Sequence, residues 1–345
     1  MNNRLISGMP AIVLAFFIAC LALAGCEKQA SGTRLGGMQG TAMWHVTISD
    51  ELPGGVDETQ LMQGINAAFA HSGKLIAGWD KTSEISRFNQ YAGVDWFPVS
   101  PELVKVVATA LELSRQSDGA YDVTVGPLIE LWGFSAEHAG KDQVPSQAEI
   151  DAARARVGSQ KLEARLSPPA LRKLRADVHV ELASLADGFA ADLAGEYLES
   201  QGIHNYMVEI AGEIRTRGVS PRGDAWQIAI EKPLESGRAV QQGIHLGDAG
   251  LATSGDYRNF FMQGGKRYSH TIDPHTGFPV THNLASVSVV AESGMLADAY
   301  ATLLMSLGEE KGKLFAEQRG LAAYFIWRTD SGFGVYSTKG FSKYF

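Results

Sequence analysis

The sequence has 345 residues, 45% of them hydrophobic and 20% charged, and its formal net charge is −8. The composition is that of an ordinary globular protein. The chain is long enough to bury a sizeable core in one large domain or in two closely packed lobes. A nucleic-acid-binding protein usually carries a basic stripe, and because this sequence has none, the composition argues against a nucleic-acid partner.

The first 26 residues have the pattern of an export signal. The apolar run 11–23 is too short to span a membrane comfortably, but its length is typical of a signal-peptide core. It ends in Leu23-Ala24-Gly25-Cys26, which is similar to the lipobox of bacterial lipoproteins. This resemblance implies a signal peptide over 1–25, acyl chains such as palmitate on Cys26, and a lipid-anchored protein on the periplasmic side of a bacterial membrane. The alternatives are a plain secretory signal and an N-terminal anchor helix.

Cysteine usage narrows the chemistry of the rest of the chain. Cys20 and Cys26 are its only cysteines, so the sequence beyond them has no disulfide, thiolate nucleophile or sulfur-ligated metal. The polar, glycine-containing stretch that follows Cys26 predicts a tether over 26–39 and one domain over 40–345.

The remaining pattern mixes helices and strands. A turn-rich connection is expected over 83–89. The mixture lacks strict alternation and repeats, which predicts an α+β fold: a single two-lobed domain with mixed or antiparallel sheets flanked by helices. Neither GxGxxG nor a Walker A loop is present, so any nucleotide binding is of another type. Helices are expected over 57–76, 100–117, 146–157, 186–201, 294–307 and 309–319, and strands over 41–49, 171–182, 205–210, 226–231, 239–246, 285–290 and 322–327.

Two oxygen-bearing side chains lie four residues apart in the helix expected over 294–307. Asp298 and Thr302 therefore share one face, about a turn apart. A carboxylate with a hydroxyl suits a hard cation such as Mg²⁺. The helix is otherwise largely apolar, and a carboxylate buried there needs a partner. The alternative is an ordinary solvated helix face.

The stretch 268–279 contains two prolines and a glycine, which predicts a tight, shaped loop. Its His270 can change protonation near neutral pH and is a candidate general base. The alternative is a loop histidine that is hydrogen-bonded to the backbone.

Two further stretches join a helix end to polar residues. Gly119 is placed to end a helix, and the backbone of 118–122 with Asp122 could bind a polar ligand, unless this is an ordinary turn. In 181–188, Ser184 is expected to cap the following helix together with Asp187, and a helix N-terminus also favours phosphate. Capping alone is the alternative there.

Eight ordered blocks resemble the FAD:protein FMN transferases, the ApbE-like family, over about 40–329. The resemblance implies that FAD is a substrate and Mg²⁺ a cofactor. In this chemistry a threonine of an acceptor flavoprotein attacks the FMN phosphorus, and AMP leaves. The blocks are 40–44, 86–89, 118–134, 181–192, 206–213, 252–257, 268–277 and 297–302.

The resemblance also assigns roles by position. His270 is the candidate base, Trp79 offers a ring for stacking on FAD, and Ser184 contributes to the metal site through its backbone carbonyl. Three positions depart from the family pattern: Glu181 is usually Asp, Asp187 is often Lys or Glu, and Ala211-Gly212 replaces Gly-Gly. The flavin-site positions are Met43, Trp79, Ala120, Tyr121, Asp122, Glu181, Asp187 and Ile272, and the metal-site positions are Ser184, Asp298 and Thr302.

Two other activities fit the same residues. A Mg²⁺-dependent FAD pyrophosphatase would use water in place of threonine and needs the same metal and base. A non-catalytic flavin-binding lipoprotein would store or deliver FAD. The expected acceptors of the leading hypothesis are threonine-containing flavoproteins of membrane-bound or exported redox complexes.

Overall fold

A computed structural model describes residues 32–135 and 143–345. The predicted signal peptide 1–25 and Cys26 lie outside these residues. The helices are α2 (Glu58–Ile76), α3 (Glu84–Gln90), α4 (Pro101–Gln116), α5 (Gly126–Leu131), α6 (Gln147–Arg154), α7 (Ala183–Ser200) and α8 (Gly294–Gln318). The strands are β1 (Thr33–Gln39), β2 (Ala42–Ile48), β3 (Phe97–Pro98), β4 (Leu162–Leu166), β5 (Pro169–Lys173), β6 (Tyr206–Ile210), β7 (Glu213–Arg217), β8 (Trp226–Glu231), β9 (Val240–Leu246), β10 (Ala249–Gly255), β11 (Phe260–Gln263), β12 (Lys266–Ser269), β13 (Leu284–Ala291), β14 (Ala322–Thr329) and β15 (Gly332–Ser337).

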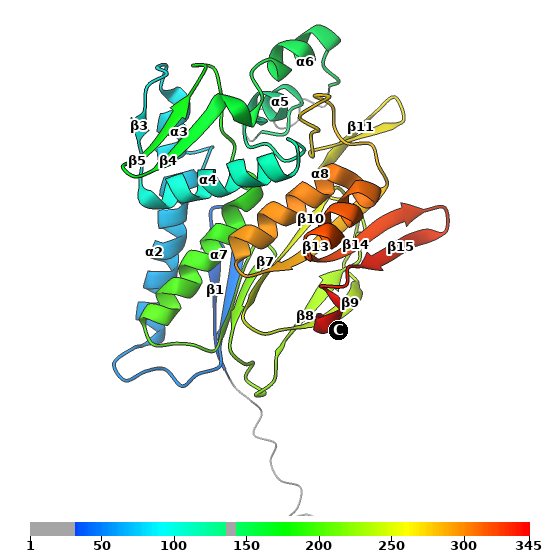
Figure 1. Ribbon diagram of the computed structural model, residues 1–345. Coiled ribbons are helices and arrows are strands. Elements are labelled where there is room, and N and C mark those ends of the chain that lie inside the picture. The colour runs from blue at the N-terminus through cyan, green and yellow to red at the C-terminus, as the bar shows by residue number, and fades with distance from the viewer. Residues whose placement is uncertain (1–31, 136–142) are drawn as a thin grey trace, which may run out of the picture.

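An eight-stranded sheet is the centre of the fold, in the order β1-β2-β6-β7-β10-β13-β14-β15. A three-stranded sheet, β3-β5-β4, and the two-stranded sheets β8-β9 and β11-β12 accompany it. Every strand pair in the described residues is antiparallel. Figure 1 shows the small sheet, with α3 to α6, above the end of the large sheet that α7 and α8 cover. The predicted α+β fold with antiparallel sheets and flanking helices is confirmed.

The large sheet is covered on both faces near its centre. Strand β13 is buried along almost its whole length. Val287 and Val289 pack in one cluster with α8 residues such as Leu304, whereas Val290 packs in another cluster with Ile244 of β9. Alternate side chains of a strand point to opposite faces, so a strand covered on both sides is apolar throughout. The buried strands of this sheet form the surface on which α7 and α8 pack.

The helix boundaries follow from local chemistry. Asp57 Oδ1 accepts a hydrogen bond from the Gln60 amide, and Gln60 Oε1 accepts one from the Asp57 amide. This capping box starts α2 where the sequence predicts it. Helix α8 breaks at Gly308 (φ 76°), where the sequence predicts two helices to meet. His282 Nε2 donates to the Met305 carbonyl at 2.8 Å, which satisfies a carbonyl left open by the break.

Three local predictions are wrong. The tether was expected over 26–39, but 33–39 forms β1, an edge strand paired with β2 along its whole length. Residues 83–89 form α3, started by Ser83, whose hydroxyl accepts from the Ser86 amide. The strand expected over 171–182 ends at Lys173. Beyond it, the Asn89 side chain exchanges two hydrogen bonds with the Val180 backbone and replaces a strand partner there.

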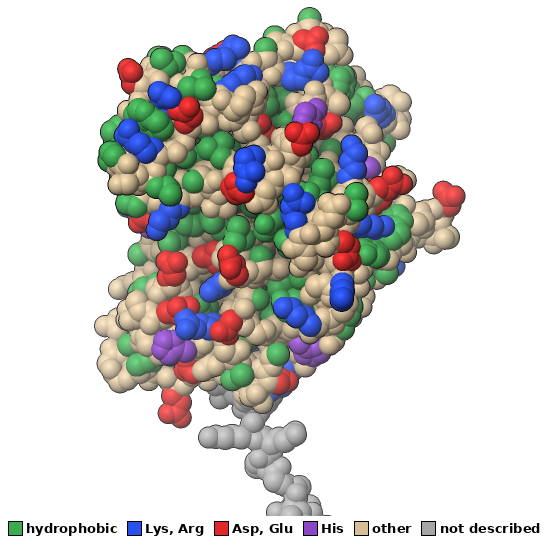
Figure 2. Space-filling model, in the orientation of Figure 1, with side chains coloured by type: hydrophobic (Ala, Val, Ile, Leu, Met, Phe, Trp, Pro, Cys, Tyr) green, Lys and Arg blue, Asp and Glu red, His purple; other side chains and the backbone are tan. Residues whose placement is uncertain are grey.

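The surface carries charges of both signs. Figure 2 shows Lys, Arg, Asp and Glu interspersed over the face that it displays. Across residues 32–135 and 143–345, no helix has the length and apolar character needed to cross a membrane.

Candidate active site

Helices α7 and α8 meet at a pair of glycines. A Cβ on Gly188 would lie 2.2 Å from the Gly294 carbonyl oxygen, so only residues without a side chain allow this approach. As a result, the Gly188 amide donates to Asp298 Oδ2 at 3.2 Å. The structure thereby places Asp298 against the first turns of α7, beside Ser184 and Asp187.

Tyr121 connects the end of α4 to α7. Asp118 (φ 53°) and Gly119 (φ 79°) turn the chain out of α4, as the sequence predicts for Gly119. The buried hydroxyl of Tyr121 then lies 2.8 Å from Ser184 Oγ. Burial raises the pKa of Tyr121, and the nearby Asp298 and Asp122 carboxylates add to this, so the phenol stays protonated.

The carboxylate of Asp122 is hydrogen-bonded within the protein. Its Oδ1 accepts from the amide and hydroxyl of Thr124, and its Oδ2 accepts from the Ser159 amide. These bonds tie two loops together. The residue borders the cavity described below, but its carboxylate is engaged by the protein itself.

Ser184 does not cap α7. The helix begins at Ala183, its N-cap Leu182 has no side-chain cap, and the Ser184 hydroxyl contacts Tyr121 instead. Glu181 Oε1 accepts from the Ala183 amide at 3.0 Å and takes over the expected capping role. The predicted capping box of Ser184 and Asp187 is therefore wrong, because the helix starts earlier than the sequence pattern suggested.

His270 follows β12 and begins the predicted loop. Its amide and its Nδ1 both donate to the Asn259 carbonyl, at 3.1 and 3.2 Å. With the Nδ1 proton committed to that carbonyl, Nε2 is left as the proton acceptor. Burial lowers the pKa of His270, while the Asn259 carbonyl and the Asp256 carboxylate oppose this shift. The loop itself is held by Trp132 Nε1, which donates to the Gly277 carbonyl at 2.8 Å.

These elements enclose one space, here called the central cavity, with a volume of about 310 Å³. It brings together the four stretches that the sequence predicts to meet, and Glu213 from a fifth part of the chain. The residues that line it include Ala120, Tyr121, Asp122, Glu181, Ser184, Asp187, Glu213, His270, Ile272, Asp298 and Thr302.

Two predicted flavin-site residues lie outside the lining of the central cavity. Trp79 is 70% exposed and Met43 is 57% exposed. Gly78, next to Trp79, packs so closely on Glu181 that an added Cβ would lie 3.2 Å from its carboxylate. The Met43 carbonyl accepts from the Ala211 amide, in the turn that leads to Glu213. Both side chains are thus next to lining residues and face solvent.

Glu213 is a site residue that the sequence did not reveal. It follows a two-residue turn in which Ala211 (φ 56°) adopts the left-handed conformation usual for glycine, and Gly212 has φ 112°. This is the hairpin turn whose twist matches antiparallel strands, so the alanine leaves the expected geometry intact. Glu213 belongs to a block that carries the family resemblance, but a Glu beginning a strand gives no sign by itself that it faces inward.

The cavity concentrates acidic side chains. Burial raises the pKa of Asp298, Asp187 and Glu213. The Asp187 carboxylate adds to the rise in pKa at both Asp298 and Glu213. Of the described residues that line the cavity, none is Lys or Arg. In residues 32–135 and 143–345, no three His, Cys, Asp or Glu side chains are grouped as a ready metal site. A cation here would therefore need hydroxyl, carbonyl, water or phosphate oxygens too, which is how Mg²⁺ is commonly held.

The lowered pKa of His270 predicts how pH affects the protein. Because the folded pKa lies below the ordinary 6.5, the folded state binds fewer protons, and its stability falls as pH drops below about 6.5. A base with this pKa stays competent into mildly acidic solution. The acid limb that His270 contributes to the pH dependence of kcat/KM should lie below pH 6.5. A limb above that value that disappears in His270→Ala would contradict the assignment.

Comparison with known proteins agrees with the geometry. The model of the ApbE family matches residues 40–325. An FAD:protein FMN transferase of Vibrio cholerae is 42% identical over 331 residues, covering 96% of this chain and 98% of that protein. One of Haemophilus influenzae is 40% identical over 345 residues, covering 99% of this chain and 98% of that protein. The solved flavin transferase ApbE from Vibrio cholerae superimposes with a TM-score of 0.84 at 40% identity, covering 91% of this chain and 99% of that one. The chain belongs to the ApbE family.

Proposed function

We propose that this chain is a Mg²⁺-dependent FAD:protein FMN transferase that attaches FMN through a phosphoester to a threonine of an acceptor flavoprotein. The relatives named FAD:protein FMN transferase, matched over nearly their whole length, support the overall reaction. The expected covalent change is balanced: a threonine Oγ–P bond forms, the bridging P–O bond of FAD breaks, the hydroxyl proton is removed, and AMP leaves.

One observation carries the metal dependence. The lining of the central cavity includes three partly buried carboxyl groups, those of Asp187, Glu213 and Asp298, and its described residues include no Lys or Arg. Burial favours the protonated form of these carboxyl groups, and their ionisation beside a pyrophosphate would be costly without a cation. A divalent cation between carboxylate and phosphate oxygens removes this conflict. The donor set fits such a hard cation.

Side-chain chemistry assigns the donors. Asp298 has one carboxylate oxygen on the Gly188 amide and its other oxygen available. Thr302 lies one turn along the same face of α8, and both line the cavity. The Ser184 hydroxyl is occupied by Tyr121, so its carbonyl is the donor that fits. When bound, Mg²⁺ would supply charge stabilisation for the pyrophosphate.

The remaining roles follow from position. His270 Nε2 accepts the proton of the attacking threonine hydroxyl. At about 310 Å³, the cavity is at the small end for a ligand site, so it takes part of FAD. The rest extends towards Glu181, where the exposed ring of Trp79 can stack on it.

The cellular location follows from the N-terminal sequence. A signal peptide over 1–25 and acylation of Cys26 would anchor the domain on the periplasmic side of a bacterial membrane. Its acceptors would then be flavoproteins of membrane-bound or exported redox complexes.

The test is co-expression of the full chain with a threonine-containing acceptor flavoprotein, followed by mass spectrometry of the acceptor. Transfer predicts an acceptor heavier by one FMN, and a Thr→Val acceptor is the control. AMP and free FMN with an unmodified acceptor would show a pyrophosphatase instead. Flavin binding without AMP release under any divalent ion would indicate a storage or delivery protein.

A further inference from the structure

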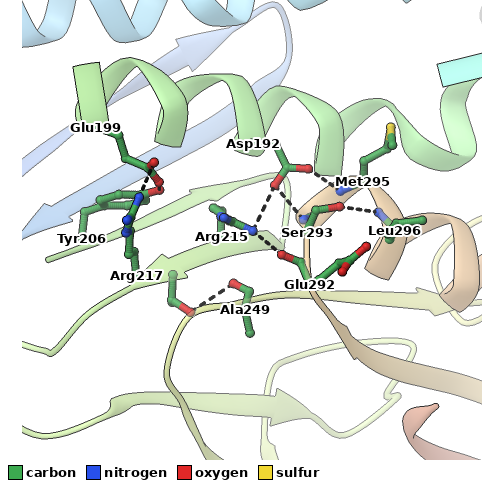
Figure 3. A network of polar contacts seen from close by, with 12 residues as sticks. Asp192, Glu199, Tyr206, Arg215, Arg217, Ala249, Glu292, Ser293, Met295 and Leu296 are labelled. Carbon is green, nitrogen blue, oxygen red and sulfur yellow. Dashed lines mark hydrogen bonds and ion pairs between the residues drawn. The ribbon is translucent and has the colours of Figure 1, made fainter. Parts of the chain in front are cut away.

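A carboxylate outside the central cavity holds the start of α8. Asp192, on α7, accepts from the Gly294 amide at 2.7 Å and from the Met295 amide at 2.9 Å. Figure 3 shows its side chain directed from α7 onto the first turn of α8. The first amides of a helix have no partner within the helix, so an external acceptor is needed where that end is buried. Asp192 supplies this acceptor from a different helix.

The remaining amides of this turn are satisfied locally. Ser293 Oγ accepts from the Leu296 amide, and the Ser293 carbonyl accepts from the Ala297 amide. Asp192 is therefore the long-range connection in an otherwise local cap. Its negative charge also lies at the positive end of the α8 dipole, where a carboxylate is stabilising.

The same contact lies beside the metal-site carboxylate. Gly188 and Asp192 are four residues apart on α7 and so face α8 together. A Cβ on Gly294 would lie 2.6 Å from the Gly188 carbonyl oxygen, while the Gly188 amide donates to Asp298. The position of Asp298 relative to Ser184 therefore depends on how closely α8 is held to α7.

Arg215 holds Asp192 from the sheet. This residue of β7 lies 3.9 Å from Asp192 Oδ1 and donates to the Glu292 carbonyl, just before α8. Figure 3 shows the Arg215 side chain between Asp192 and the Glu292 carbonyl. Since Glu213 of the central cavity lies two residues away on the same strand, this arrangement links β7, α7 and α8 at the edge of the site.

We infer that Asp192 is a positioning residue that sets Asp298 for the divalent cation by holding α8 against α7. Asp192 does not line the central cavity, so it would act through α8. The inference rests on the proposed Mg²⁺ site. It adds a residue outside the cavity to those on which cation binding depends. The cation site would need Asp192 to accept the hydrogen bonds of the first amides of α8.

The test is Asp192→Asn. The amide keeps the shape of the side chain but presents its NH₂ group to one of the two backbone amides, so one bond becomes a repulsion between donors. Loss of an outer partner typically weakens metal binding about 10- to 100-fold. Titration of Mn²⁺ followed by electron paramagnetic resonance should show Kd raised by about tenfold or more. AMP release should need more Mg²⁺ but return to within about twofold of the wild-type kcat at saturation.

Glu199→Gln is the matched control. Glu199 also lies on α7, but its side-chain partners belong to the sheet: it pairs with Arg217 of β7 and accepts from the Tyr206 hydroxyl of β6. This variant should lower thermal stability without changing the Mn²⁺ Kd. Gly294→Ala provides a second, chemically different test, because its Cβ would push α8 from the Gly188 carbonyl and should raise Kd as Asp192→Asn does.

The outcomes separate the inference from the proposed function. If the wild type binds Mn²⁺ and both Asp192→Asn and Gly294→Ala bind it equally well, the positioning role is overturned while the metal site stands. An equal loss of affinity in Glu199→Gln would also overturn it, because the effect would then be general destabilisation. If the wild type transfers FMN in EDTA and binds no Mn²⁺, the proposed cation fails, and the positioning role fails with it.

Discussion

Replacing Asp298 with alanine is expected to abolish Mg²⁺-dependent release of AMP from FAD while the protein stays folded. A bound metal contributes several kcal/mol to charge stabilisation during phosphoryl transfer. Each 1.36 kcal/mol is a factor of ten in rate, so we expect a loss of about 10³-fold or more. The fold should survive, because burial raises the pKa of this carboxyl and alanine removes a group that is costly to bury without a cation.

The measurement pairs AMP release with thermal unfolding. In wild type, Mg²⁺ with FAD should raise Tm by stabilising the folded state, and Asp298→Ala should lose this rise. The control is Glu310→Ala, which removes an exposed carboxylate of the same helix and should change neither quantity. Unchanged turnover of Asp298→Ala at limiting Mg²⁺ would refute the metal assignment.

Replacing His270 with alanine is expected to reduce transfer by about 10²- to 10⁴-fold, the usual contribution of a general base. FAD affinity should change far less, because the proposed role of the imidazole is to take a proton from the acceptor hydroxyl. The Nδ1 bond to the Asn259 carbonyl supports that role, since it directs the accepting Nε2 away from the backbone.

His275→Ala is the matched control for this prediction. His275 belongs to the same loop, its side chain is 59% exposed, and it does not line the central cavity. Single-turnover transfer and equilibrium FAD binding should be measured for both variants. Equal losses of transfer and of FAD binding in His270→Ala would count against the base role, as would an equally large effect of His275→Ala.

The pattern of apolar residues was sufficient to predict the long helices of the fold. Helices α2 and α4 each bury one face, and their apolar spacing shows this directly. Helices α7 and α8 are buried on more than one face, and their length and largely apolar composition indicate them instead. The edge strand β1 was missed because it is glycine-containing and half exposed, so its structure comes from pairing with β2. A short, half-exposed strand that is stabilised by pairing with a neighbour need not show an alternating apolar pattern in its own sequence.

The sequence predicted some of the site residues and missed others. The ordered blocks place His270, Ser184 and Asp298 together because they carry the family's spacing, and the structure brings all three to the central cavity. Glu213 and Asp192 were not assigned roles because their importance comes from burial and from bonds to distant backbone. An acidic residue in a strand or helix is usually solvated, so only the folded arrangement distinguishes these two.

If Cys26 is acylated as proposed, the start of β1 would limit how far the domain can stand from a membrane. The strand is paired with β2 from Thr33 onward, which is seven residues after Cys26 in the sequence. A fully extended chain of that length spans at most about 25 Å. This is less than the thickness of a typical bilayer with its headgroups, about 40 Å. An anchored enzyme would therefore work close to the lipid surface, and would reach only those threonines that its acceptors present near the same leaflet.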